Sequence, residues 1–220
     1  MKKPFKNVLF ELHQELPHDF CGSLGEVGHA DATAAIDTLK RYRVPLRIPE
    51  VLAREAYYIL ETMTREYVVE HWAWAVPSDE AIGRLVRYSP IVEIGAGRGY
   101  WARLAAEAGA DVVAYDSIPP KRRFFPVRRG GSNMARYHAD RALFLCWPPY
   151  ASPMASKCLA NYAGSTVIFV GEGCTGSSHF HDTLQRRWEI VEAIHIPQWF
   201  GLHDRMYVFR RRSKHGEHGA

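Results

Sequence analysis

One loop constrains this chain more than any other feature of its sequence. Three glycines at alternate positions, Gly95, Gly97 and Gly99, directly follow the short apolar run 91–94. Glycine lets a backbone turn sharply and lets a ligand approach the main chain closely, because no Cβ stands in the way. A helix-forming segment comes next. This order predicts a strand–loop–helix unit with a ligand site at the turn.

The same alternation of strand and helix continues to the end of the chain. Repeated units of this kind indicate an α/β protein with a doubly wound, mostly parallel sheet, which binds ligands at the carboxyl ends of its strands. The expected strands are 91–94, 111–116, 124–127, 143–146, 166–170, 190–196 and 205–210, and the expected helices are 100–108, 152–163 and 178–187.

The first part of the chain has a different pattern. Residues 1–30 hold scattered prolines and glycines without a sustained period, which predicts an irregular segment. Helices are expected from Asp31 to about Tyr42, from Pro49 onward, and after Ser78 as an N-cap. We therefore expect an irregular and helical N-terminal cap over 1–88, a ligand-binding α/β domain over 89–212 and a disordered tail over 213–220.

Composition excludes several protein classes. Of 220 residues, 47% are hydrophobic, which is enough for one well-buried core. No apolar run approaches the roughly 20 residues of a membrane span, and the basic start lacks the apolar stretch of a secretory signal. The four cysteines show neither a CxxC pair nor zinc-ligand spacing, as expected of reduced thiols. We expect a soluble, cytoplasmic protein without a membrane segment or a metal site.

Charge is unevenly distributed along the chain. Residues 1–116 carry 13 Lys and Arg against 17 Asp and Glu, whereas residues 117–220 carry 15 against 7, so the second half is basic by eight charges. Arginine clusters in it could attract phosphates, or they could be a solvated loop and a basic tail. Nucleic acid therefore remains an alternative partner to a small molecule.

The residues around the glycines distinguish between two ligand classes. A dinucleotide site has the pattern G-x-G-x-x-G, but here Tyr100 occupies the place of the last glycine, and Glu93 would repel a pyrophosphate. S-adenosylmethionine, with an ammonium and a sulfonium and no phosphate, would instead be attracted by that carboxylate. Asp116 ends the next strand, 17 residues after Gly99, where its carboxylate can accept both ribose hydroxyls of such a nucleoside.

With these motifs, the segment from Tyr88 to Arg210 resembles the class I, Rossmann-fold methyltransferases that use S-adenosylmethionine. The resemblance depends on the acidic residue and three glycines of 93–99, on Asp116, and on the motif Cys-Trp-Pro-Pro-Tyr at 146–150. It implies a seven-stranded sheet and an N-terminal helical addition over the methyl acceptor. No clear acid marks the adenine pocket after the third expected strand, where Asp140 is nearest.

The resemblance also implies roles for single residues. The glycines would line the methionine part of the cofactor, Glu93 would support the loop and the amino group, Asp116 would bind the ribose, and Ser117 would lie beside the adenine. Cys146 and Trp147 would close over the methyl group. The expected cofactor-binding residues are Glu93, Gly95, Ala96, Gly97, Gly99, Asp116, Ser117, Cys146, Trp147 and Trp74.

The motif at 146–150 also bears on the acceptor. Enzymes that methylate amino groups of nucleic acid bases resemble one another in an Asp, Asn or Ser before Pro-Pro-Tyr, and that side chain accepts a hydrogen bond from the amino group. Trp147 stands here instead, with an N–H donor and no acceptor. Its ring could stack on a flat acceptor, lie near the sulfonium or belong to the core.

The candidate catalytic residues are Trp147, Tyr150, Glu172 and His203. Glu172 follows the fifth strand, and the imidazole of His203 could act as a general base, although each could also be an ordinary loop residue. Trp74 could roof the site or pack between subdomains. The expected function is methyl transfer from S-adenosylmethionine to a small, biosynthetic acceptor. The alternatives are an RNA methyltransferase and a non-catalytic binding protein with the cofactor fold.

Overall fold

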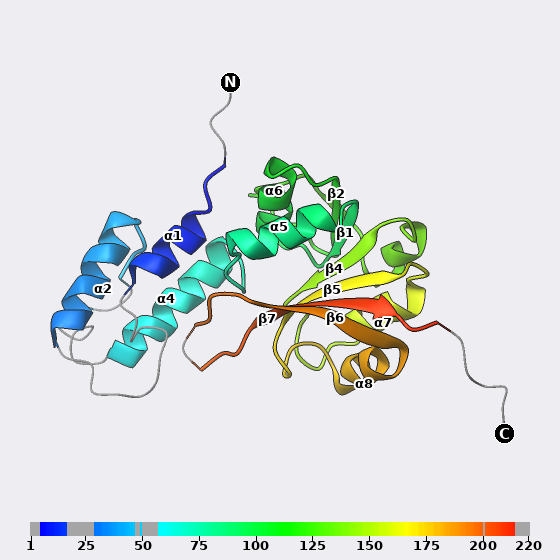
Figure 1. Ribbon diagram of the computed structural model, residues 1–220. Helices are drawn as coiled ribbons and strands as arrows, with labels where there is room; N and C mark the ends of the chain where they lie inside the picture. The colour runs from blue at the N-terminus through cyan, green and yellow to red at the C-terminus, as the bar shows by residue number, and fades with distance from the viewer. Residues whose placement is uncertain (1–4, 17–28, 47–48, 50–56, 200, 214–220) are drawn as a thin grey trace.

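The structure, a computed structural model, describes residues 5–16, 29–46, 49, 57–199 and 201–213. One seven-stranded sheet dominates it, in the order β3-β2-β1-β4-β5-β7-β6 (Figure 1). The strands are β1 (Ile91–Ile94), β2 (Val112–Asp116), β3 (Val127–Arg129), β4 (Ala142–Cys146), β5 (Thr166–Gly171), β6 (Trp188–His195) and β7 (Arg205–Arg211). The five adjacent strands β3, β2, β1, β4 and β5 are parallel to one another, whereas β7 is antiparallel to both β5 and β6. The expected mostly parallel, doubly wound sheet is therefore confirmed.

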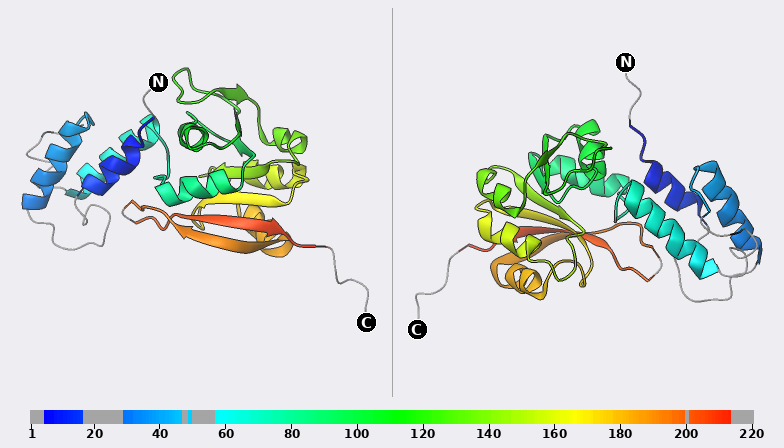
Figure 2. Two further views of the ribbon diagram at one scale, coloured as in Figure 1. Left: turned by 45° about the horizontal axis from the view of Figure 1, so that its top comes forward. Right: turned by 180° about the vertical axis from the view of Figure 1, so that it is seen from behind.

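Helices cover both faces of this sheet (Figure 2). Successive strand residues point to opposite faces, so Ile91 packs with the helices of one cluster and Val92 with those of the other. The first face carries α5 (Asp79–Arg87) and α6 (Tyr100–Glu107), and the second carries η2 (Ser132–Tyr137), α7 (Met154–Asn161) and α8 (Ser178–Arg187). The helices α1 (Val8–Glu15), α2 (His29–Arg41) and α4 (Tyr57–His71) lie beyond one end of the sheet, and their buried residues join the core of the first face (Figure 1).

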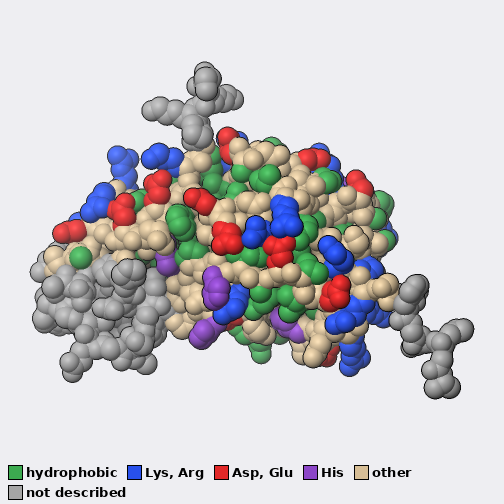
Figure 3. Space-filling view, viewed as in Figure 1, with side chains coloured by type: hydrophobic (Ala, Val, Ile, Leu, Met, Phe, Trp, Pro, Cys, Tyr) green, Lys and Arg blue, Asp and Glu red, His purple; other side chains and the backbone are tan. Residues whose placement is uncertain are grey.

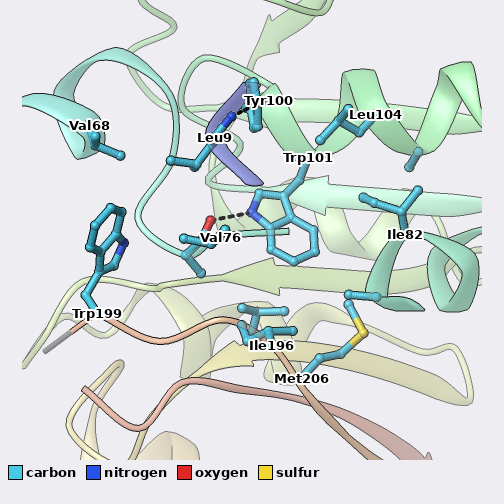
Figure 4. Packing of buried hydrophobic residues seen from close by; sticks show 14 of the residues in the cluster. Leu9, Val68, Val76, Ile82, Tyr100, Trp101, Leu104, Ile196, Trp199 and Met206 are labelled. Carbon is cyan, nitrogen blue, oxygen red and sulfur yellow. Dashed lines mark hydrogen bonds between the residues drawn. The ribbon is translucent and has the colours of Figure 1, made fainter. Parts of the chain in front are cut away.

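The N-terminal helices are attached to the first turn of α6. The Leu9 backbone N–H donates to the Tyr100 hydroxyl (3.1 Å), and Trp101 Nε1 donates to the Ala75 carbonyl (3.2 Å) (Figure 4). The Tyr100 hydroxyl itself donates to Asn7 Oδ1 (3.1 Å). Tyr100 and Trp101 are both buried. The residue that replaces a dinucleotide glycine therefore serves as an anchor that fixes the N-terminal region beside the glycine loop.

The expectation of an irregular segment over residues 1–30 is wrong for α1. The Asn7 side chain caps this helix by accepting from the Phe10 backbone N–H, and Leu9, Leu12 and Leu16 are buried. Eight residues are too few for a helical period to stand out in the sequence. Residues 1–4 and 17–28 lie outside the described residues.

Other boundaries also differ from expectation. α2 begins at His29, so Asp31 is inside the helix instead of capping it. β3 covers Val127–Arg129 and not 124–127, because pairing with β2 sets Ala114 opposite Val127. The connection from β2 to β3 contains no helix over 117–126, and a 3-10 helix follows β3. Ser78 caps α5 as expected. Residues 50–56 of the helix expected from Pro49, and the tail 214–220, lie outside the described part.

No helix among the described residues is long and apolar enough to cross a membrane.

Candidate functional site

A cavity of about 520 Å³ lies at the carboxyl ends of β1, β2 and β4, roofed by the residues that follow α4. Its size suits a small-molecule ligand. The glycine loop, the end of β2 and the segment after β4 meet here because their strands are adjacent and parallel. The lining contains every expected cofactor-binding residue except Gly99, namely Glu93, Gly95, Ala96, Gly97, Asp116, Ser117, Cys146, Trp147 and Trp74.

The three glycines of the loop differ in what surrounds them. All three have positive φ angles, 82° at Gly95, 53° at Gly97 and 71° at Gly99. A Cβ at Gly99 would come within 2.9 Å of side-chain atoms of both Phe125 and Val127, whereas a Cβ at Gly97 would meet nothing within 4 Å. Gly99 therefore lets the loop pack against the segment that leads into β3, and Gly97 presents its backbone to the open cavity.

Asp116 braces this loop. Its Oδ2 accepts from the Gly97 backbone N–H and its Oδ1 from the Ile118 backbone N–H, both at 2.9 Å. Each carboxylate oxygen has a second lone pair, so both can still accept from a ligand hydroxyl. Ser117 lies next to it in the lining, and Gly130 and Gly131 form the wall beyond. Asp140 is not among the lining residues.

Glu93 is the most unusual group of the cavity. Only 2% of it is exposed, and its Oε2 has no hydrogen-bond partner among the described residues. Burial, followed by the charge of Asp116, raises its pKa to about 8, while the backbone of Ala102 favours the ionised form. A buried carboxyl group that lines a cavity and has an unused oxygen is suited to a cationic ligand group, which would stabilise its ionised form.

Two arginines that sequence reasoning did not assign also lie at this site. Arg98, inside the glycine loop, donates from Nε to the Glu70 carbonyl (2.8 Å) and from Nη1 to the Arg122 carbonyl (3.1 Å), so it joins the loop to the segments on either side. Its position between two of the glycines is the signal that could have identified it. Arg65, on α4, has no comparable signal, because only the tertiary structure brings that helix to the cavity.

Two indoles form one wall of the cavity. Trp74 and Trp147 are stacked, with ring centroids 5.3 Å apart and planes 18° from parallel. The guanidinium of Arg65 lies 5.8 Å and 5.4 Å from their respective centroids. Trp147 has a positive φ of 49°, uncommon for a residue with a side chain. This backbone turn, which precedes the two prolines, directs the indole toward Trp74.

A buried acid holds Trp147 in place. Its Nε1 donates to Asp204 Oδ1 at 2.9 Å, and Asp204 has no exposed surface. Burial raises the pKa of Asp204 to about 6, while the bond from Trp147 opposes that rise. Because β7 is antiparallel, the residue before it lies at the same sheet edge as the ends of the parallel strands. Sequence reasoning did not assign Asp204.

The structure brings only Trp147, of the four candidate catalytic residues, to this cavity. Glu172 and His203 line a second cavity, where the His203 backbone N–H donates to Glu172 Oε2 (3.0 Å). Tyr150 is 78% exposed and lines neither cavity.

Comparison with known proteins gave remote structural likeness only. No family model and no curated protein sequence matches the chain. A Burkholderia thailandensis 1,6-didemethyltoxoflavin-N1-methyltransferase shares 14% identity over 77% of this chain and 92% of its own, with a TM-score of 0.49. CalO1, a methyltransferase in calicheamicin biosynthesis, shares 14% over 93% and 71%, with a TM-score of 0.41. Human N-acetylserotonin methyltransferase shares 12% over 84% and 66%, with a TM-score of 0.38.

The fold is assigned from the sheet itself. The sheet has the seven strands that the family resemblance implied, with five adjacent parallel strands and an antiparallel β7 between β5 and the edge strand β6. The ligand cavity lies at the carboxyl ends of the central parallel strands, as in other doubly wound sheets. The chain has the fold of the class I, Rossmann-fold methyltransferases.

Proposed function

We propose that this protein is an S-adenosylmethionine-dependent methyltransferase that acts on a small-molecule acceptor. The observation that carries the proposal is the buried carboxyl group of Glu93, which lines the cavity beside the glycine loop and whose Oε2 has no partner among the described residues. The cofactor's ammonium would supply that partner. A pyrophosphate at the same place would raise the pKa of this carboxyl further and would meet no ionised partner, so the position suits an ammonium and disfavours a dinucleotide.

The other lining residues suit the remaining parts of this cofactor. Asp116 has lone pairs left for two ribose hydroxyls, and the backbone of Gly97 is open to close approach. The guanidinium of Arg98, which lines the cavity, can bind the cofactor's carboxylate. Ser117 and the two glycines 130 and 131 line the part of the cavity next to Asp116, where the adenine would lie. Each chemical group of the cofactor thus finds a matching group in one cavity.

When bound, the cofactor supplies an electrophilic methyl group on a sulfonium. The chain's contribution is to orient the reactants and to exclude water, which together can lower a barrier by several kcal/mol. The stacked indoles of Trp74 and Trp147 form an apolar wall at the cavity, and an aromatic face attracts a nearby cation. The reaction would be an in-line displacement by an acceptor atom that approaches along this wall.

The hydrogen bonds of several arginines in the basic half of the chain favour a small acceptor over RNA. Arg123 donates to the Val127 carbonyl, Arg211 to the carbonyls of Tyr162 and Gly164, and Arg212 to that of Trp188. These side chains are thus partly engaged in holding the fold. On the face drawn in Figure 3, acidic and basic side chains are interspersed and do not form a single basic surface. RNA binding depends mainly on such a surface.

Calorimetry with purified protein tests the cofactor. S-adenosylmethionine and S-adenosylhomocysteine should bind at micromolar levels and NAD should not bind. Tight binding of NAD, or no binding of either sulfur compound, would reject the proposal.

Transfer of a labelled methyl group tests the acceptor. A small-molecule extract should accept the label and total RNA should not. Label in RNA, with RNA binding that weakens steeply as salt rises, would support the RNA alternative. Cofactor binding without labelling of either would support the non-catalytic alternative.

A further inference from the structure

A second cavity, of about 760 Å³, lies between α8 and the antiparallel end of the sheet. It is larger than the cavity beside the glycine loop, and the two cavities have no lining residue in common. It contains Glu172 and His203 but neither indole of the Trp74–Trp147 pair. Methyl transfer as proposed above assigns it no role.

Strand register builds an aromatic floor for this cavity. Along β7, Arg205, Tyr207 and Phe209 alternate with residues that pack on the other face of the sheet. Pairing sets Phe169 of β5 opposite Tyr207, with ring centroids 6.3 Å apart and planes 15° from parallel, and Ile190 of β6 opposite Phe209. The floor therefore runs across three strands.

One helix covers this floor incompletely. Leu184 of α8 packs onto it and is 3% exposed, but Ile190, on the edge strand, is 58% exposed. One exposed aliphatic side chain is ordinary on a protein surface, but Ile190 pairs with Phe209 and lines the cavity, so its exposed surface is continuous with the aromatic floor. Figure 3 shows hydrophobic side chains at the surface near β6 and β7, next to basic ones. The result is an open apolar groove between α8 and β6.

The charges along this groove favour an anion. Arg205, the first residue of β7, lies at one end of the groove, opposite Gly171 of β5. The described residues provide no ion pair or side-chain hydrogen bond for its guanidinium. The side chain of Arg212, near the other end, donates from Nε to the Trp188 carbonyl, and no carboxylate of the described residues pairs with it. Glu172 is the one carboxylate among the lining residues that the structure describes, and it accepts from the His203 backbone.

We propose that this groove binds an amphipathic anion, whose aromatic or aliphatic body lies on Tyr207 and Phe209 and whose single acidic group reaches Arg205. A free small molecule fits better than a strand added to the edge. β6 has an irregularity between Ile190 and Glu192, and Glu189 is an exposed charge on the same strand; both features discourage edge pairing. The proposal is independent of the proposed methyl transfer.

Displacement of a fluorescent probe from the full-length protein tests this site. 8-Anilinonaphthalene-1-sulfonate, an aromatic sulfonate, should bind in a saturable way. Dodecanoate should displace it at concentrations at least tenfold lower than dodecyltrimethylammonium, with both kept below micelle formation. S-adenosylhomocysteine should not displace it. Equal displacement by the anion and the cation, or displacement by S-adenosylhomocysteine, would overturn the proposal.

Two pairs of variants locate the binding. Arg205→Ala should weaken dodecanoate at least fivefold, whereas Arg210→Ala, an exposed arginine of β7 outside the groove, should change it less than twofold. Ile190→Glu should also weaken it at least fivefold, whereas Val191→Glu, the next residue and not part of the lining, should not. Wild-type binding by Arg205→Ala and Ile190→Glu would contradict the proposal. The proposal would also be contradicted if the wild-type protein were a dimer that binds no probe and if Ile190→Glu converted that dimer to monomers.

Discussion

The indole nitrogen of Trp147 donates a 2.9 Å hydrogen bond to the carboxylate of Asp204, 57 residues further along the chain. The bond joins the end of β4 to the start of β7 across the carboxyl edge of the sheet. It fixes an indole with a positive φ in contact with Trp74, and so it determines the shape of the wall along which the acceptor would approach.

This relationship predicts a split between turnover and cofactor affinity. Trp147→Ala should lower the turnover number while the dissociation constant of the cofactor changes less, because in the proposed site the indole would lie at the reacting methyl and most cofactor contacts would lie elsewhere. Labelled methyl transfer and calorimetry measure the two quantities. If the free energy of unfolding falls by the ~3–5 kcal/mol typical of truncating a core tryptophan, the residue is structural instead.

Asp204 should act through Trp147. Asp204→Asn keeps an oxygen acceptor for the indole N–H and should retain most of the activity. Asp204→Ala leaves that N–H without a partner, which costs about 1–3 kcal/mol of stability, and should lower turnover as Trp147→Ala does. Urea unfolding and methyl transfer measure these effects. Equal turnover in Asp204→Ala and the wild type would disprove the positioning role.

Asp116→Ala should weaken cofactor binding by about 100-fold or more. The carboxylate would accept two ribose hydroxyls, each hydrogen bond to a charged group contributes roughly 1.5–3 kcal/mol, and every 1.4 kcal/mol is a factor of ten. Asp116→Asn keeps one acceptor and should lose less. Calorimetry on folded protein measures both, and unchanged affinity in Asp116→Ala would remove this residue from the site.

Cofactor affinity should depend on pH through Glu93. The pKa of this carboxyl is about 8 in the ligand-free protein, so below pH 8 it is mostly neutral, and pairing with the cofactor's ammonium requires the loss of its proton. The dissociation constant should therefore fall as pH rises toward 8, by at most tenfold per unit. Calorimetry in buffers of different ionisation enthalpy should detect proton release. Glu93→Gln should bind weakly with little pH dependence; proton release that persists in this variant would contradict the assignment.

The same group should make the ligand-free protein less stable as pH rises. A pKa raised from 4.5 to about 8 means that the folded state holds the proton more tightly than the unfolded state. The free energy of unfolding should therefore decrease between about pH 4.5 and 8, by up to ~1.4 kcal/mol per unit. Urea unfolding across this range should show a shallower decrease in Glu93→Gln. Identical slopes in both proteins would argue against a neutral, buried Glu93.

Local sequence patterns were sufficient for the central strands and the glycine loop. The apolar run before Gly95, the glycines and the acid that ends β2 form one strand–loop–helix–strand unit whose pairing is local in sequence, so strand period and glycine placement predict it. Likewise, nine of the ten expected cofactor residues share one cavity, because parallel strands bring their carboxyl ends together. The three residues of β3, two of them exposed, were misplaced because pairing and not periodicity defines so short an edge strand.

The tertiary structure alone decided which distant residues meet. Arg65 and Asp204 lie far from the motifs in sequence, and only the docking of α4 and the antiparallel insertion of β7 bring them to Trp147. The same insertion turns Glu172 and His203 toward the second cavity, although both lie at the edge where catalytic residues were expected. Sequence periodicity reports which face of an element is apolar, but contacts between elements depend on how those faces pack, which the local pattern does not contain.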